Sequence, residues 1–137
     1  MTDASDVSDT SDASDAATVY ERAGGAEFFF ALVERFYERV AADELLRPMY
    51  PDDLNDATRH LALFLIQYWG GPPTYAAERG HPRLRARHLP FVIGERERDH
   101  WFSHMRAAVL ESGAGADVEA AMLDYFANAA TFMINAH

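Results

Sequence analysis

Apolar residues recur every three or four positions in this chain from Tyr20 onward, and no convincing stretch alternates with a period of two. This spacing places apolar side chains on one face of an α-helix, so it predicts an all-α fold for this part of the chain. The first long helix is expected from about Gly25 to Ala42. Its predicted buried face consists of Phe29, Leu32, Val33, Phe36, Tyr37 and Val40.

Glycine and proline residues divide the rest of the chain into helices and connections. Pro48 and Pro51 bracket Tyr50 and fix it in a corner, because they prevent a regular helix from continuing. Asp53 or Asn55 can cap the helix that follows. The further helices are expected over residues 53–68, 82–89, 95–112 and 117–135, and an ordered loop over 72–80. Periodicity alone leaves a helical bundle and a shortened globin as alternatives.

The composition suits one packed domain, because 49% of the 137 residues are hydrophobic. The chain has no cysteine, which excludes disulfides, thiolate catalysis and cysteine-ligated metals. Residues 1–19 carry an aspartate at every third position from Asp3 to Asp15 and no basic residue. We therefore expect a disordered acidic N-terminal tail over residues 1–19, followed by one domain over residues 20–137.

The formal net charge of -10 argues against nucleic acid as a partner, because nucleic-acid binding draws on clustered Lys and Arg. No run reaches the roughly 18 apolar residues that span a bilayer. The N-terminal segment has neither the basic nor the apolar region of a targeting peptide. These features predict a soluble, cytoplasmic protein with no membrane partner.

Most of the six histidines need no special explanation. His100 and His104 lie four residues apart on one predicted helix and match a chelating pair, but no third ligand is evident in the sequence. His88 ends the short helix expected over residues 82–89, where an imidazole can point inward. Taken without any resemblance, the residues favour a satisfied core or rim histidine at position 88.

His88 belongs to the segment Gly-His-Pro-Arg-Leu-Arg-Ala-Arg-His-Leu-Pro-Phe, residues 80–91. Together with Gln-Tyr-Trp-Gly-Gly at residues 67–71 and with Trp101, this segment resembles the truncated haemoglobins of group II, the O-type branch, and the likeness extends over about residues 19–133. The resemblance implies a two-over-two helical globin fold with haem b (heme b, iron protoporphyrin IX) as the cofactor. It implies that His88 is the proximal ligand of the haem iron and that Arg87 pairs with a haem propionate.

The resemblance also implies roles on the opposite wall of the haem site. Tyr37, Tyr50 and Trp101 match the positions that donate hydrogen bonds to a bound ligand, and Ala57 stands where many globins have a distal histidine. The other residues expected to contact the haem are His60, Leu61, Phe64, Tyr75, Phe91 and Met105. Without the resemblance, the three polar aromatics are more simply interpreted as core side chains.

The function that the resemblance implies is binding of oxygen, or of another diatomic such as NO or CO, with slow release, as an oxygen carrier or store. The alternative is a haem-dependent redox enzyme, either a nitric oxide dioxygenase or a peroxidase-like protein. The sequence contains no flavin or nicotinamide fingerprint, so this alternative requires a separate reductase. A third interpretation is a haem-free helical interaction module. Both a monomer and a homodimer are compatible with the sequence.

Overall fold

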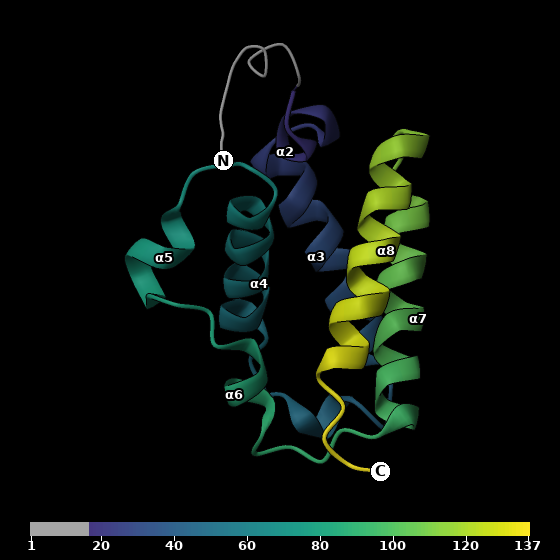
Figure 1. Ribbon diagram of the computed structural model, residues 1–137. Helices are drawn as coiled ribbons and strands as arrows, with labels where there is room; N and C mark the ends of the chain where they lie inside the picture. The colour runs from purple at the N-terminus through teal and green to yellow at the C-terminus, as the bar shows by residue number, and fades with distance from the viewer. Residues whose placement is uncertain (1–16) are drawn as a thin grey trace.

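The computed structural model describes residues 17–137, and all the regular structure in that part of the chain is helical (Figure 1). The predicted all-α fold is therefore confirmed. One short 3-10 helix, η2, covers Arg47–Met49. The α-helices are α2 (Val19–Ala23), α3 (Ala26–Ala41), α4 (Asn55–Tyr68), α5 (Thr74–Arg79), α6 (Leu84–His88), α7 (Glu95–Glu111) and α8 (Ala116–Phe132). None of these described helices is both long and apolar enough to cross a membrane.

The four long helices form two pairs, α3 with α4 and α7 with α8. Helix α3 also packs against α7, so the two pairs share one core. Helix α5 lies beside α4, and α6 lies near one end of α4 (Figure 1). This is the two-over-two arrangement that the resemblance implies. All six residues predicted for the inner face of α3 are buried. Burial of each such side chain contributes about 1.5 to 3 kcal/mol, which makes α3 a central element of the core.

Helix α2 begins at Val19, within the segment predicted to be the acidic tail. Thr18 caps it: the Thr18 hydroxyl accepts the Glu21 N–H at 3.0 Å, and the Glu21 carboxylate accepts the Thr18 N–H at 3.1 Å. The Tyr20 N–H then donates to the Trp69 carbonyl at 3.0 Å and ties α2 to the end of α4. Residues 1–16, which make up most of the predicted tail, lie outside the described part of the chain.

Two predicted boundaries and one predicted helix cap were wrong. Residues 74–79 form α5 rather than a loop, and the Ala76 N–H is held by the Gln67 side chain at 2.9 Å. Helix α4 has Leu54 at its N-cap, while the Asp53 side chain accepts the Asn55 N–H at 2.8 Å as a local turn. Helix α8 ends at Phe132 rather than near Asn135, because the last residues turn to bond elsewhere.

Gly71 lets the end of α4 approach its neighbours closely. A Cβ atom at this position would lie 2.6 Å from a methyl group of Ile66 and 2.8 Å from the Tyr20 ring. Any larger residue would push these side chains apart. The glycine pair therefore does more than end the helix, since it also allows α2 to pack on α4.

The corner after α3 is organised by Asp43, whose side chain is only 8% exposed. One carboxylate oxygen accepts the N–H groups of Leu45 and Leu46 at 2.8 and 3.2 Å. The other accepts hydrogen bonds from His100 at 2.9 Å and His104 at 2.6 Å, both on α7. His100 and His104, whose spacing alone would also allow a chelating pair, therefore share one carboxylate oxygen, which joins α7 to the corner that carries Tyr50.

The environment of Asp43 also sets its acidity. Burial alone would raise the pKa of the Asp43 carboxyl. The hydrogen bonds from His104, His100 and the backbone of Leu46 and Leu45 outweigh burial and hold this pKa well below its usual range. The carboxylate therefore stabilises the fold at neutral pH. That contribution is complete above the ordinary aspartate pKa of about 4 and is lost as the pH falls toward the lower folded-state pKa.

We predict that Asp43→Asn lowers the free energy of unfolding at pH 7 by about 1 to 3 kcal/mol, because hydrogen bonds to a charged acceptor are lost. The difference from the parent protein should shrink as the pH falls below about 4. Urea denaturation at several pH values measures both effects.

Asp99→Asn provides a matched control on the surface. The Asp99 side chain is 61% exposed and pairs with Arg98 at 3.2 Å, so its replacement should change the unfolding free energy by less than about 1 kcal/mol. A loss in Asp43→Asn no larger than that of the control would show that the corner does not depend on Asp43.

Candidate functional site

A cavity of about 370 Å³ lies between the two helix pairs and α6. This volume falls within the usual range of roughly 300 to 1,000 Å³ for sites that bind small molecules and cofactors. Eleven of the twelve predicted site residues line it: Tyr37, Tyr50, Ala57, His60, Leu61, Phe64, Tyr75, Arg87, His88, Phe91 and Trp101. Met105 is not among the lining residues, because it is fully buried in the core that α7 shares with α3.

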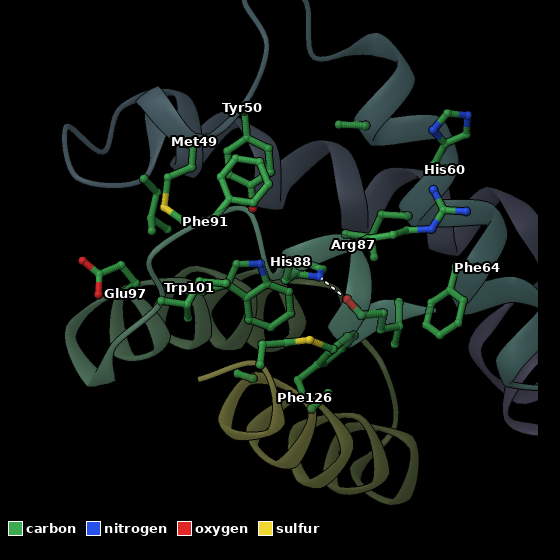
Figure 2. Close-up of a pocket in the computed structure, with 18 of the residues that line it drawn as sticks. Met49, Tyr50, His60, Phe64, Arg87, His88, Phe91, Glu97, Trp101 and Phe126 are labelled. Carbon is green, nitrogen blue, oxygen red and sulfur yellow. Dashed lines mark hydrogen bonds between the residues drawn. The ribbon is translucent and has the colours of Figure 1, made fainter. Parts of the chain in front are cut away.

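His88 is the last residue of α6, and its ring is held by one hydrogen bond. The Nδ1 atom lies 2.5 Å from the carbonyl oxygen of Leu84, one turn earlier (Figure 2). A carbonyl can only accept, so Nδ1 carries a proton, and in the neutral ring Nε2 is the nitrogen with the lone pair. An imidazole oriented in this way by a carbonyl is the usual state of a histidine that ligates a metal.

The segment after His88 is held in place by hydrogen bonds from Asn135, near the C-terminal end of the chain. The Asn135 amide nitrogen donates to the carbonyls of His88 at 3.3 Å and Phe91 at 2.9 Å, and its side-chain oxygen accepts the Ile93 N–H at 2.9 Å. The backbone N–H of Asn135 also donates to the Ile93 carbonyl at 2.8 Å. Asn135 thereby closes the turn that carries the candidate ligand. Nothing in the local sequence signals this role, since the partners lie more than 40 residues apart.

Arg85 provides a second contact that holds α6 against the C-terminal end of the chain. Its guanidinium donates to the carbonyls of Phe132 at 2.7 Å and Ile134 at 3.0 Å, and it lies over the Phe132 ring. These contacts satisfy two carbonyls at and just beyond the end of α8, which have no partner inside the helix. The short helix α6 is therefore held to the end of α8 at two points.

Polar aromatic side chains line the wall near the Asp43 corner. The rings of Tyr37 and Tyr50 meet edge to face with centroids 5.6 Å apart, and the Trp101 ring packs on Phe36 at 5.1 Å. Burial raises the pKa of Tyr50 to about 12, and a hydrogen bond with Trp101 opposes this shift only in part. Burial, with a smaller effect from Tyr50, also raises the pKa of Tyr37 far above its usual value. Both phenols therefore remain protonated at neutral pH and available as O–H donors.

The other walls are apolar. Leu61 and Phe64 come from α4, and the Phe64 ring meets Tyr75 at 5.6 Å. Helix α8 provides a wall that the sequence predictions did not include, and Figure 2 shows Phe126 on the side of the cavity opposite Tyr50. The lining residues from or next to α8 are Tyr125, Phe126, Ala129, Ala130 and Met133.

Basic groups gather among the residues that line the cavity near α5 and α6. Arg87 donates through Nε to the Pro82 carbonyl at 2.8 Å, and Arg79 lies 3.4 Å from the His60 ring. Arg79 was missed because residues 72–80 were predicted to be a loop. The remaining lining residues not predicted as site residues are Leu46, Met49, Pro51, Leu65, Leu84, Ile93, Glu97 and Arg98.

These features fit haem in three respects. The walls are largely apolar, as the flat porphyrin requires. One imidazole lines the cavity with an unprotonated nitrogen, as haem iron requires. Arg79, Arg87 and His60 provide donors that suit two carboxylates. Two helix pairs around such a cavity define the molecule as a small globin.

The comparisons with known proteins agree with this assignment. Residues 18–135 match the family model described as bacterial-like globin. The chain is 43% identical over 111 residues to "Group 2 truncated hemoglobin YjbI" of Bacillus subtilis, an alignment that covers 81% of this chain and 84% of the relative. The chain belongs to the bacterial-like globin family, and the predicted resemblance to group II truncated haemoglobins is confirmed.

Solved structures give the same answer. A thermostable haemoglobin from the actinobacterium Thermobifida fusca is 54% identical and superposes with a TM-score of 0.85, covering 87% of this chain and 98% of that one. The truncated oxygen-avid haemoglobin of Bacillus subtilis is 43% identical with a TM-score of 0.82, covering 87% of this chain and all of that one (100%). Both structures therefore share the fold of this chain, and their sequence identity to it is high enough to indicate membership of the same family.

We predict that Asn135→Ala loosens the turn after His88. Amide hydrogen exchange at Ile93 should become faster, because its N–H loses its acceptor, and the unfolding free energy should fall by about 1 to 3 kcal/mol. Asn128→Ala is the matched control, since within residues 17–137 the Asn128 side chain bonds only to the Asp124 carbonyl of its own helix, at 3.0 Å. Equal exchange at Ile93 in both variants would contradict the fastening role of Asn135.

Proposed function

We propose that this chain binds haem b in the cavity, with His88 Nε2 as the proximal iron ligand, and that it binds oxygen and other diatomics such as NO or CO with slow release. The observation that carries the proposal is the orientation of His88. Its Nδ1 is held by the Leu84 carbonyl, and it lines the same cavity as the donors Tyr37, Tyr50 and Trp101. A histidine placed only for packing would not explain why three polar aromatic side chains line the same cavity.

Ferrous haem would supply the reversible binding of a diatomic gas. The protein's own contribution on the proximal side is to keep His88 in one tautomer through Leu84 and to hold its turn through Asn135. Arg87, Arg79 and His60 would bind the two propionates, since guanidinium groups match carboxylates in geometry and charge. The apolar side chains that α4 and α8 contribute to the cavity would help to exclude water from a bound porphyrin.

On the distal side, Tyr37, Tyr50 and Trp101 would donate hydrogen bonds to a ligand that carries negative charge. Each donor to a charged acceptor contributes about 1 to 3 kcal/mol. Two of them together would slow release by roughly 30-fold to more than 10⁴-fold, at about 1.4 kcal/mol per factor of ten. Ala57 leaves the space of a distal histidine open, so these three residues take over the role of that histidine.

Slow release argues against bulk oxygen delivery and in favour of scavenging or storage. The Bacillus subtilis relative is described as oxygen-avid, which agrees with a distal site rich in donors. The second candidate is a redox enzyme that converts nitric oxide or peroxide with the help of a separate reductase. It is favoured by the oxidisable tyrosines in and beside the cavity.

We predict that the purified parent protein, given haem and reduced, shows a five-coordinate ferrous spectrum that changes to a stable new spectrum with oxygen. His88→Gly should lose this spectrum and regain it when imidazole is added, because free imidazole replaces the missing ligand. His81→Gly is the matched control, since His81 does not line the cavity and its ring accepts the Arg83 N–H at 3.1 Å. A His88→Gly variant that binds haem and oxygen like the parent would exclude His88 as the ligand.

We predict that Trp101→Phe raises the oxygen dissociation rate by about tenfold or more, because a donor worth at least about 1.4 kcal/mol is lost. Stopped-flow displacement of oxygen measures the rate. Trp69→Phe is the same substitution at a residue that does not line the cavity, and its rate should match the parent's. An unchanged rate in Trp101→Phe would remove Trp101 from the distal site.

A further inference from the structure

We propose that the surface around α6 is the docking site of a small acidic electron-carrier protein of the ferredoxin type, which returns ferric haem to the ferrous state. We call this surface the α6 face, and it consists of Arg83, Arg85, Leu89, Phe91, Val92 and Phe132. The inference rests on the proposed haem site and deepens it, because it names the chemistry of the reductant and its point of contact.

The charge of the chain is unevenly distributed, and the α6 face lies in a basic stretch. Residues 79–94 contain four arginines and no aspartate or glutamate, a formal charge of +4. The whole chain carries -10, so its other residues carry -14. Within residues 17–137, none of these four arginines forms an ion pair with a carboxylate. An acidic partner is therefore attracted to this stretch and repelled by the rest of the chain.

Arg83 is an arginine that local folding does not require. Its backbone φ of +48° lies in the left-handed region, which favours glycine or asparagine. Its backbone N–H bonds to His81, but within residues 17–137 its guanidinium makes no hydrogen bond or ion pair. Arg83 also does not line the cavity. Its charge is therefore available to a molecule outside the chain.

Apolar side chains complete the α6 face. Four of the six exposed large apolar side chains of residues 17–137 lie there: Leu89, Phe91, Val92 and Phe132. Arg85 connects the parts from α6 and α8, because its guanidinium lies over the Phe132 ring, 5.7 Å from the centroid. Protein interfaces commonly combine an apolar centre with a polar rim, and those of electron carriers are small. The α6 face has the composition of such a small, transient interface.

The α6 face also lies next to the candidate iron ligand. Phe91 lines the cavity and is 40% exposed, so it borders both the cavity and the surface. Its backbone N–H donates to the His88 carbonyl at 3.0 Å, and both side chains border the cavity (Figure 2). An electron that enters here has a short path to haem held by His88. The carrier loses one electron and ferric haem gains it, and no atom or proton is transferred.

Two other occupants fit the α6 face less well. A second copy of this chain, placed face to face, would bring two basic surfaces together. Residues 1–16 carry five aspartates, but the described chain begins next to α2, which Figure 1 shows at the end of the molecule opposite α6. An acidic protein from outside the chain is therefore the preferred occupant.

The first test maps the contact by nuclear magnetic resonance. Haem-loaded, nitrogen-15-labelled protein in the ferrous, carbon monoxide-bound form is titrated with oxidised plant-type ferredoxin, an acidic carrier. Amide signals of residues 83–92 and of Phe132 should shift or broaden. The effect should weaken as the salt concentration rises from about 0.05 to 0.5 M, because salt screens exposed charges.

The second test measures electron transfer by stopped flow, with ferric haem-loaded protein mixed with photoreduced ferredoxin under carbon monoxide. Arg83→Glu and Val92→Glu should each lower the second-order rate constant by about fivefold or more, because each places a negative charge in the contact. Their haem uptake and oxygen dissociation should equal the parent's, since neither residue lines the cavity. Arg106→Glu and Leu110→Glu are the matched controls: both residues are exposed on α7 outside the cavity lining, and both variants should react like the parent.

Several results would overturn the docking proposal and leave the haem proposal standing. These are a failure of ferredoxin to bind, amide changes away from the α6 face, or equal rates in all four variants. Amide signals of the α6 face that change without ferredoxin, when the five aspartates of residues 3–15 are replaced by asparagine, would assign the face to that segment instead. Signals there that change with protein concentration would assign it to a second copy. A parent that takes up no haem overturns both proposals.

Discussion

One hydrogen bond decides which nitrogen of His88 is available to a ligand. The Leu84 carbonyl, 2.5 Å from Nδ1, requires a proton on that atom and leaves Nε2 as a base. The bond exists because both residues lie on one turn of α6, and α6 is held in place by Asn135 and Arg85. The candidate iron ligand is thus oriented by its own helix and positioned by the C-terminal end of the chain. Without this orientation, the cavity would be an apolar space with a histidine on its wall.

The opposite wall depends on a second set of contacts far from the first. Asp43 joins the corner before Tyr50 to α7, which carries Trp101, through His100 and His104. This arrangement brings three polar aromatics from three separate segments to one side of the cavity. Their high pKa values keep the phenols as donors at neutral pH. One side of the site is therefore built by contacts between α6 and the C-terminal end of the chain, and the other by contacts between the corner after α3 and α7.

Local signals predicted the helices well and their junctions less well. The inner face of α3 follows from spacing alone, because each apolar residue falls on the same side. The start of α2 was missed although Thr18 and Glu21 have capping-box spacing, since the acidic repeat before them dominated the interpretation. Eleven residues of the cavity wall followed from the family resemblance. Asn135, Arg79 and the wall from α8 did not, because their roles depend on contacts across tens of residues. Met105 was predicted to contact the haem, but it lies on the face of α7 that is buried in the core.

A crystal structure of the haem-loaded protein tests the central claim most directly. We expect His88 Nε2 to coordinate the iron, with Nδ1 still bonded to the Leu84 carbonyl, and Tyr37, Tyr50 and Trp101 on the opposite face of the porphyrin. Iron bound by another side chain, such as His60, or haem located outside this cavity would contradict the account.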